Sequence, residues 1–122
     1  MISYSTLGTD DMSRSIMFYD NVFGAIDGIR EVTSETWVQY GRENEKGKVC
    51  LTFPHDGNRA KNGNGTMLAF NAKDYKSVDA FYAAALAHGG SDAGKPGIRE
   101  STHYVAYVRD PYGNKLCVFT PK

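Results

Sequence analysis

Two stretches of this sequence repeat each other and decide its fold: Lys48-Val49-Cys50-Leu51-Thr52-Phe53-Pro54 and Lys115-Leu116-Cys117-Val118-Phe119-Thr120-Pro121. Both read lysine, apolar residue, cysteine, three variable residues and proline, at an offset of 67 residues. A second match places Phe18-Tyr19 over Phe81-Tyr82, at an offset of 63 residues. The matches come in the same order, so we infer a duplicated module of about sixty residues, with a short insertion late in the second copy.

Each copy is predicted to contain one strand, one helix and three further strands. The first helix follows a capping Asp10 or Asp11 and ends at Gly24, and the second follows Asp74 and ends before Gly89-Gly90. Apolar residues recur at helical spacing within 12–24 and 75–87. The predicted strands are 2–7, 29–33, 36–40 and 48–53 in the first copy, and 66–72, 91–94, 104–109 and 115–120 in the second.

The chain is expected to form one domain. Its 122 residues suffice for a single core. Between the copies, a polar segment rich in glycine and asparagine has no apolar period and is predicted to be a loop. We therefore divide the single domain 1–122 into modules 1–55 and 65–122, joined by loop 56–64.

The charge balance excludes several classes of partner. Lysine and arginine total 14, as do aspartate and glutamate, so the net charge is zero. A neutral chain lacks the basic surface of a nucleic-acid binder, and no apolar run approaches the length of a membrane span. We expect a cytoplasmic protein without nucleic-acid or membrane partners. Its two cysteines, Cys50 and Cys117, are too few for a disulfide framework.

The order of these features identifies a known family. The segments that carry the match are 6–11 with Phe18-Tyr19, 63–66, 78–82, 96–99 and the turn segment 108–115, which contains Asp110-Pro111-Tyr112-Gly113-Asn114. Over essentially its whole length the chain resembles the vicinal oxygen chelate superfamily. This superfamily includes glyoxalase I, extradiol dioxygenases, and fosfomycin and bleomycin resistance proteins; the chain is most similar to its short bacterial glyoxalase-like members.

The resemblance implies an α+β fold of the glyoxalase/dihydroxybiphenyl dioxygenase type. Two βαβββ modules would form a cup-shaped, eight-stranded mixed sheet with outer helices. Family enzymes hold a divalent metal in the cup, through a histidine on the first strand of a module and a glutamate on its last strand. Here Tyr4 and Met67 stand at the histidine positions, and Cys50 and Cys117 at the glutamate positions. We therefore expect no ordinary glyoxalase I activity and no resident cofactor.

Three interpretations of the cysteines stay open. Cys50 and Cys117 are most simply small core side chains. Alternatively they form a soft metal site with Met67 and Tyr4, because thiolate and thioether ligands select Cu(I) or Zn²⁺. A redox pair is the third interpretation. The alternative cofactor is thus a divalent or soft metal ion.

Several further residues are candidates for the lining of the cup. Trp37, Tyr104 and Tyr107 supply aromatic surface with a polar tip. Arg99 is a candidate clamp for a carboxylate or phosphate. His103 leads into the predicted strand 104–109 and is the histidine most favoured for a functional role.

Three functions compete on this evidence. The preferred hypothesis is a glyoxalase/bleomycin-resistance-like protein that binds a small polar or aromatic ligand in a cup without the family metal. The alternative is a metal-dependent lyase, isomerase or dioxygenase with altered, soft ligands. The third is a redox or structural protein that uses its two thiols. In each case exposed strand edges favour a homodimer.

Overall fold

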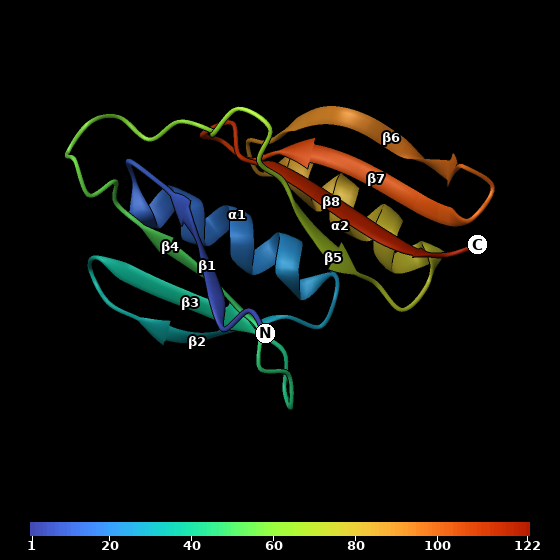
Figure 1. Cartoon of the computed structure of the whole chain (residues 1–122), viewed down its shortest axis with the longest axis horizontal. Helices are drawn as coiled ribbons and strands as arrows, with labels where there is room; N and C mark the ends of the chain where they lie inside the picture. Colours follow the sequence, from blue (N-terminus) through green and yellow to red (C-terminus); the bar gives the residue numbers. More distant parts are fainter.

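The computed structural model describes all 122 residues as two modules that lie side by side (Figure 1). The first module contains β1 (Tyr4–Gly8), α1 (Met12–Gly24), β2 (Ile29–Thr33), β3 (Trp37–Gly41) and β4 (Lys48–Thr52). The second contains β5 (Leu68–Asn71), α2 (Tyr75–Ala87), β6 (Ser91–Arg99), β7 (His103–Arg109) and β8 (Lys115–Pro121). The α+β class and the duplicated order of one strand, one helix and three strands are confirmed.

Each module forms its own four-stranded mixed sheet, so the eight strands are not one continuous hydrogen-bonded sheet. The strand orders are β1-β4-β3-β2 and β5-β8-β7-β6, with β1–β4 and β5–β8 parallel. The register repeats as well, because Thr6 lies opposite Cys50 and Ala69 lies opposite Cys117. The sequence offsets of 63 and 67 residues therefore describe equivalent positions in the two sheets.

The two helices cover one face of the sheets and pack against each other. In Figure 1, α2 lies behind β7 and β8. Each helix begins at an aspartate, since Asp11 accepts from the Arg14 N–H and Asp74 accepts from the Ser77 N–H. The buried core lies between helices and sheets. Alternate strand residues face away from the helices, and we call this side of each sheet the open face. Neither helix has the length and apolar character needed to span a membrane.

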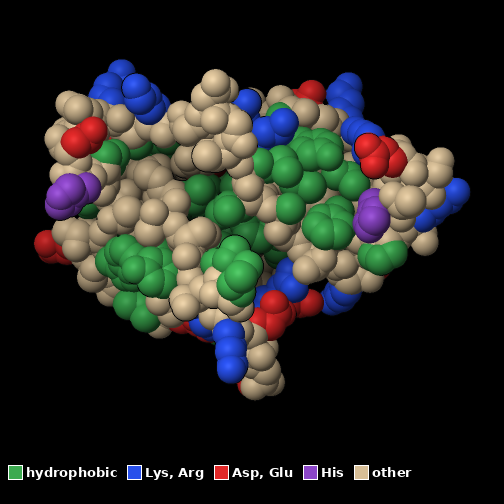
Figure 2. All heavy atoms as spheres, viewed as in Figure 1, with side chains coloured by type: hydrophobic (Ala, Val, Ile, Leu, Met, Phe, Trp, Pro, Cys, Tyr) green, Lys and Arg blue, Asp and Glu red, His purple; other side chains and the backbone are tan.

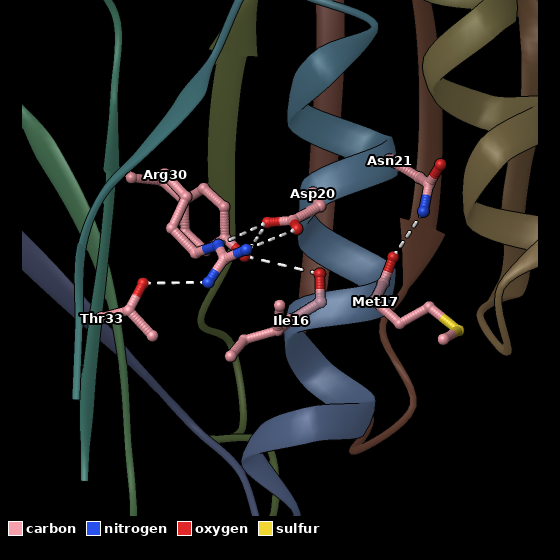
Figure 3. A network of polar contacts seen from close by, with 7 residues as sticks. Ile16, Met17, Asp20, Asn21, Arg30 and Thr33 are labelled. Carbon is pink, nitrogen blue, oxygen red and sulfur yellow. Dashed lines mark hydrogen bonds and ion pairs between the residues drawn. The ribbon is translucent and has the colours of Figure 1, made fainter. Parts of the chain in front are cut away.

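A polar network fixes α1 to the first sheet (Figure 3). The Arg30 guanidinium on β2 donates to the Asp20 carboxylate on α1 at 3.1 Å and to the Thr33 hydroxyl at 2.9 Å. The Tyr40 hydroxyl on β3 donates to the same carboxylate at 2.7 Å. Burial, and to a smaller extent this hydrogen bond, raise the pKa of Tyr40 well above its ordinary value. These contacts set the position of the helix over β2 and β3.

A second network is buried and joins the two modules. The Tyr19 hydroxyl on α1 donates to Asp110 Oδ2 at 2.6 Å. Asp110 also accepts from the Asn114 side chain at 2.8 Å and from the backbone N–H groups of Tyr112 and Asn114. The Asn114 amide in turn reaches the Gly8 carbonyl of the first module at 3.2 Å. The predicted turn between β7 and β8 is thus also a connection between modules.

One strand is longer than the sequence predicts. The sequence predicts a strand over 91–94, but β6 continues to Arg99. Two register shifts along the β6–β7 pair absorb the irregular residues. β6 is also an edge strand, where proline is tolerated because no neighbour on its outer side needs the missing N–H.

Candidate ligand-binding site

A cavity of about 440 Å³ lies on the open face of the second sheet. It is lined by Ala69, Arg99, Glu100, Thr102, His103, Val105, Tyr107, Cys117 and Phe119. The strand register brings Val105 beside Phe119 and Tyr107 beside Cys117, which gives the cavity an apolar floor. Figure 2 shows hydrophobic side chains gathered over β7 and β8. The volume lies within the range of small-molecule sites.

The polar groups of this cavity, named here the β7–β8 cavity, come from the turn between β6 and β7. Glu100 and Ser101 have φ values of 54° and 59°, and the Thr102 N–H donates to the Arg99 carbonyl at 3.2 Å. Two consecutive positive φ values are typical of a type I′ hairpin turn. This turn places Arg99 directly opposite His103 at the rim. Arg99 and His103 are therefore paired across the two strands, and both line the cavity beside its apolar floor.

Contacts within the chain orient both rim groups. The Arg99 guanidinium donates to the Lys95 carbonyl at 2.7 Å. His103 Nδ1 lies 2.8 Å from the Thr102 hydroxyl, and the His103 ring meets Phe119 edge to face, with ring centres 5.4 Å apart. The remaining guanidinium nitrogens and His103 Nε2 are free to bind a polar group of a ligand.

The two cysteines lie at equivalent places on the two open faces. Cys117 belongs to the floor of the β7–β8 cavity, and Cys50 lies under polar side chains on β2 to β4. Burial raises the pKa of Cys117, partly offset by Lys115. Burial also raises the pKa of Cys50, and the nearby Glu31 carboxylate adds to this effect. Both thiols are therefore protonated and weakly nucleophilic at neutral pH.

We predict slow alkylation of both thiols in the folded protein. Because the thiolate is the reacting species, iodoacetamide at about pH 8 should label Cys50 and Cys117 at least about tenfold more slowly than it labels the urea-unfolded chain. The labelling rate should climb only as the pH rises above the pKa of an ordinary thiol. Mass spectrometry of timed samples measures both sites. Rapid labelling of either folded thiol near pH 7 would contradict the raised pKa values and favour the redox interpretation.

The open face of the first sheet holds three more of the predicted residues, Tyr4, Trp37 and Cys50. The rings of Tyr4 and Trp37 meet edge to face with centres 5.7 Å apart. Beside Cys50, Glu31 accepts from the Gln39 amide at 3.1 Å and from the Lys48 ammonium at 3.0 Å. The hydrogen bond from Lys48 lowers the pKa of Glu31. Here the structure places an aromatic pair next to a satisfied polar cluster.

The last two predicted residues lie elsewhere. Met67 precedes β5, is 43% exposed and lines a different cavity, next to the linker. Tyr104 faces the helix side of its sheet, where its ring stacks on Tyr75 at 4.1 Å and its hydroxyl donates to Asp79 at 2.7 Å. Strand alternation accounts for this, since Tyr104 lies between His103 and Val105, which both line the β7–β8 cavity.

The residues at the family's ligand positions do not fit its divalent metal. Two of the four, Cys50 and Cys117, are thiols, and sulfur is a soft ligand that suits neither Mg²⁺ nor Mn²⁺. The other two, Tyr4 and Met67, offer a phenol and a thioether, which are poor ligands for Mg²⁺, Mn²⁺ or Ni²⁺. Cys117 and Met67 also line separate cavities.

Sequence reasoning missed several lining residues that a simple signal could have found. Phe119 lies two positions after Cys117, and Val105 lies two positions before Tyr107. Side chains two apart on a strand share a face, so the candidates themselves pointed to these neighbours. Glu100 had no such signal, because its place depends on a type I′ turn formed by residues that seldom adopt it.

Comparisons with known proteins agree with this architecture. The model of the Glyoxalase/Bleomycin resistance protein/Dioxygenase superfamily matches residues 2–118. The crystal structure of a glyoxalase/bleomycin resistance protein from Albidiferax ferrireducens T118 is 36% identical, with a TM-score of 0.89 over 98% of this chain and 97% of that one. This chain therefore belongs to the Glyoxalase/Bleomycin resistance protein/Dioxygenase superfamily.

More distant structures share the fold. TnmS3, an antibiotic binding protein from Streptomyces sp. CB03234, is 18% identical, with a TM-score of 0.68 over 100% of this chain and 96% of that one. Lactoylglutathione lyase from Agrobacterium tumefaciens is 22% identical, with a TM-score of 0.68 over 98% and 92%. A search of curated proteins finds no match. The shared fold thus accompanies both a binding protein and an enzyme.

Proposed function

We propose that this protein binds a small polar aromatic molecule in the β7–β8 cavity, without a resident metal ion. The main support is the composition of the cavity. Val105, Cys117 and Phe119 form an apolar floor, and the paired Arg99 and His103 lie at the rim. Ligand sites typically have such a composition, because apolar area supplies affinity and a few polar groups fix orientation. TnmS3, a binding protein with this fold, supports the proposal.

The lining favours an aromatic ring that carries an acidic or hydroxyl group. Phe119 and Tyr107 offer ring surfaces to an aromatic body. Arg99 offers a planar pair of donors suited to a carboxylate, and His103 offers a further ring nitrogen. Glu100, also in the lining, selects against a second acidic group on the ligand and accepts from a hydroxyl.

A binding screen tests this proposal. Benzoate, 4-hydroxybenzoate, phenol and bleomycin are titrated into the protein by isothermal titration calorimetry. We expect 4-hydroxybenzoate to bind more tightly than phenol, and Arg99→Gln to weaken its binding about tenfold, as loss of a charge-assisted hydrogen bond implies. Arg59→Gln is the matched control, because Arg59 lies in the linker and is 93% exposed. Equal effects of the two substitutions would refute the assigned role of Arg99.

The assembly state is part of the proposal, and we expect a homodimer. Tyr4, the first residue of β1, is 57% exposed, and Ile2 just before the strand is 70% exposed. Both sheets also end in edge strands that have no neighbour on one side. Exposed edges need a cover, and two-fold dimers are the commonest way to provide one. Light scattering coupled to size exclusion should therefore give about twice the chain mass of 13.4 kDa at micromolar concentration. A mass equal to one chain would contradict the dimer.

A further inference from the structure

A second cavity, of about 510 Å³, lies where the linker crosses the junction of the two modules. Its walls come from the end of β1, from the linker between Lys61 and Thr66, and from the first residues of β5 and β8. It shares no lining residue with the β7–β8 cavity. We call it the linker cavity.

The linker cavity carries positive charge without a compensating acid. Lys61 and Lys115 line it, and no aspartate or glutamate does. Neither lysine takes part in any ion pair of the structure, and the Lys115 ammonium lies 5.3 Å from the centre of the Tyr107 ring. The nearby Asp110 carboxylate is buried and engaged with Tyr19 and Asn114. In a chain of zero net charge, this is a local cationic site.

Contacts at both ends hold the linker in place over the cavity. The Ala60 N–H donates to Asp10 Oδ1 at 2.7 Å, and the Thr66 hydroxyl donates to the Gly63 carbonyl at 2.8 Å. Between these contacts, the backbone N–H groups of Gly63 and Gly65 and the side-chain nitrogen of Asn62 donate no hydrogen bond within the chain. These donors, together with the Lys61 ammonium, are suited to anion oxygens.

We propose that the linker cavity binds an organic anion, whose phosphate or carboxylate head contacts Lys61 and the free backbone N–H groups of the linker. The apolar side chains of Leu7, Met67 and Leu68 line the same cavity and would contact the body of the ligand. The cavity volume exceeds what an inorganic ion fills, since a water molecule occupies about 30 Å³ in the liquid. This site is separate from the one in the proposed function.

An amide-resolved NMR titration tests the inference. The probes are phenyl phosphate and benzoate, which differ in the head group, with phenol as the neutral analogue and inorganic phosphate as the bare head. We expect phenyl phosphate or benzoate to shift the amides of Asn62, Gly63 and Thr66, and the tighter of the two identifies the head. Binding should weaken as salt is raised, because the contacts are exposed charges.

Substitutions make the test specific. Lys61→Gln should raise the dissociation constant of the bound probe about tenfold, whereas Lys46→Gln, on the turn before β4, should leave it unchanged. Ala69→Trp, which fills the β7–β8 cavity, should also leave it unchanged, so failure of one site is distinguishable from failure of the other. Shifts confined to the β7–β8 cavity, no effect of Lys61→Gln, or equal affinity for inorganic phosphate would each overturn the inference.

Discussion

Replacing Asp110 by alanine is expected to destabilise the protein by about 3 kcal/mol or more. Asp110 is 4% exposed, and its carboxylate accepts hydrogen bonds from Tyr19, from the Asn114 side chain and from two backbone N–H groups. Its removal leaves these donors buried without a partner, and each such group costs about 1–3 kcal/mol. The loss also separates α1 from the turn that carries β8. Urea unfolding followed by circular dichroism measures the effect.

A milder substitution keeps this prediction testable if the alanine variant does not fold. Tyr19→Phe removes one hydroxyl that is bound to a buried carboxylate, and should cost about 1.5–3 kcal/mol. The chain supplies a matched control in Tyr104→Phe, whose hydroxyl binds the Asp79 carboxylate at 2.7 Å at the surface. There the loss should stay below about 1 kcal/mol, because water replaces the partner. Equal costs for the two tyrosines would contradict a stabilising role specific to the buried network.

Filling the β7–β8 cavity is expected to abolish binding of the polar aromatic ligand. Ala69 lines that cavity and is exposed on the open face, so Ala69→Trp places an indole in the ligand's space. We expect affinity to fall at least about 100-fold, which is about 2.7 kcal/mol. Stability should change little, because the new side chain lies outside the core. Calorimetric titration of the best ligand from the binding screen measures the loss.

The duplication provides the control for this experiment. Thr6 occupies the place in the first sheet that Ala69 occupies in the second, since each lies opposite the cysteine of its own module. Thr6→Trp should therefore preserve binding within about twofold, because it leaves the β7–β8 cavity open. If Thr6→Trp abolished binding and Ala69→Trp did not, the ligand site would lie on the first sheet.

Most of the fold could be predicted because the duplication supplied long-range information. A single match between Cys50 and Cys117 fixed equivalent strands, and Phe18-Tyr19 with Phe81-Tyr82 fixed equivalent helices. The division into two separate sheets could not be predicted in this way. The division depends on whether β1 and β5 form hydrogen bonds to each other, which they do not. The sequences of the two strands do not show whether such bonds form.

The candidate site was predictable in part. Arg99, His103, Tyr107 and Cys117 come together in one cavity, as the alternation of β7 and β8 permits. Tyr104 lies on the other face of the sheet. This could not be predicted, because the sequence does not show which face of the strand packs against the helices. In β7 both halves carry aromatic and apolar residues. The linker cavity was beyond prediction, since it depends on how an irregular segment crosses the junction of two modules.

The most direct test of the central claim is an amide-resolved NMR titration of the metal-depleted protein with the tightest ligand from the screen. Protein treated with EDTA and verified by elemental analysis should still bind, with the largest shifts at Ala69, Val105, Cys117 and Phe119 around the β7–β8 cavity. Addition of Zn²⁺ or Ni²⁺ should leave the affinity unchanged. The account would be contradicted if binding required the added metal, or if the shifts centred on Tyr4, Cys50 and Met67 instead.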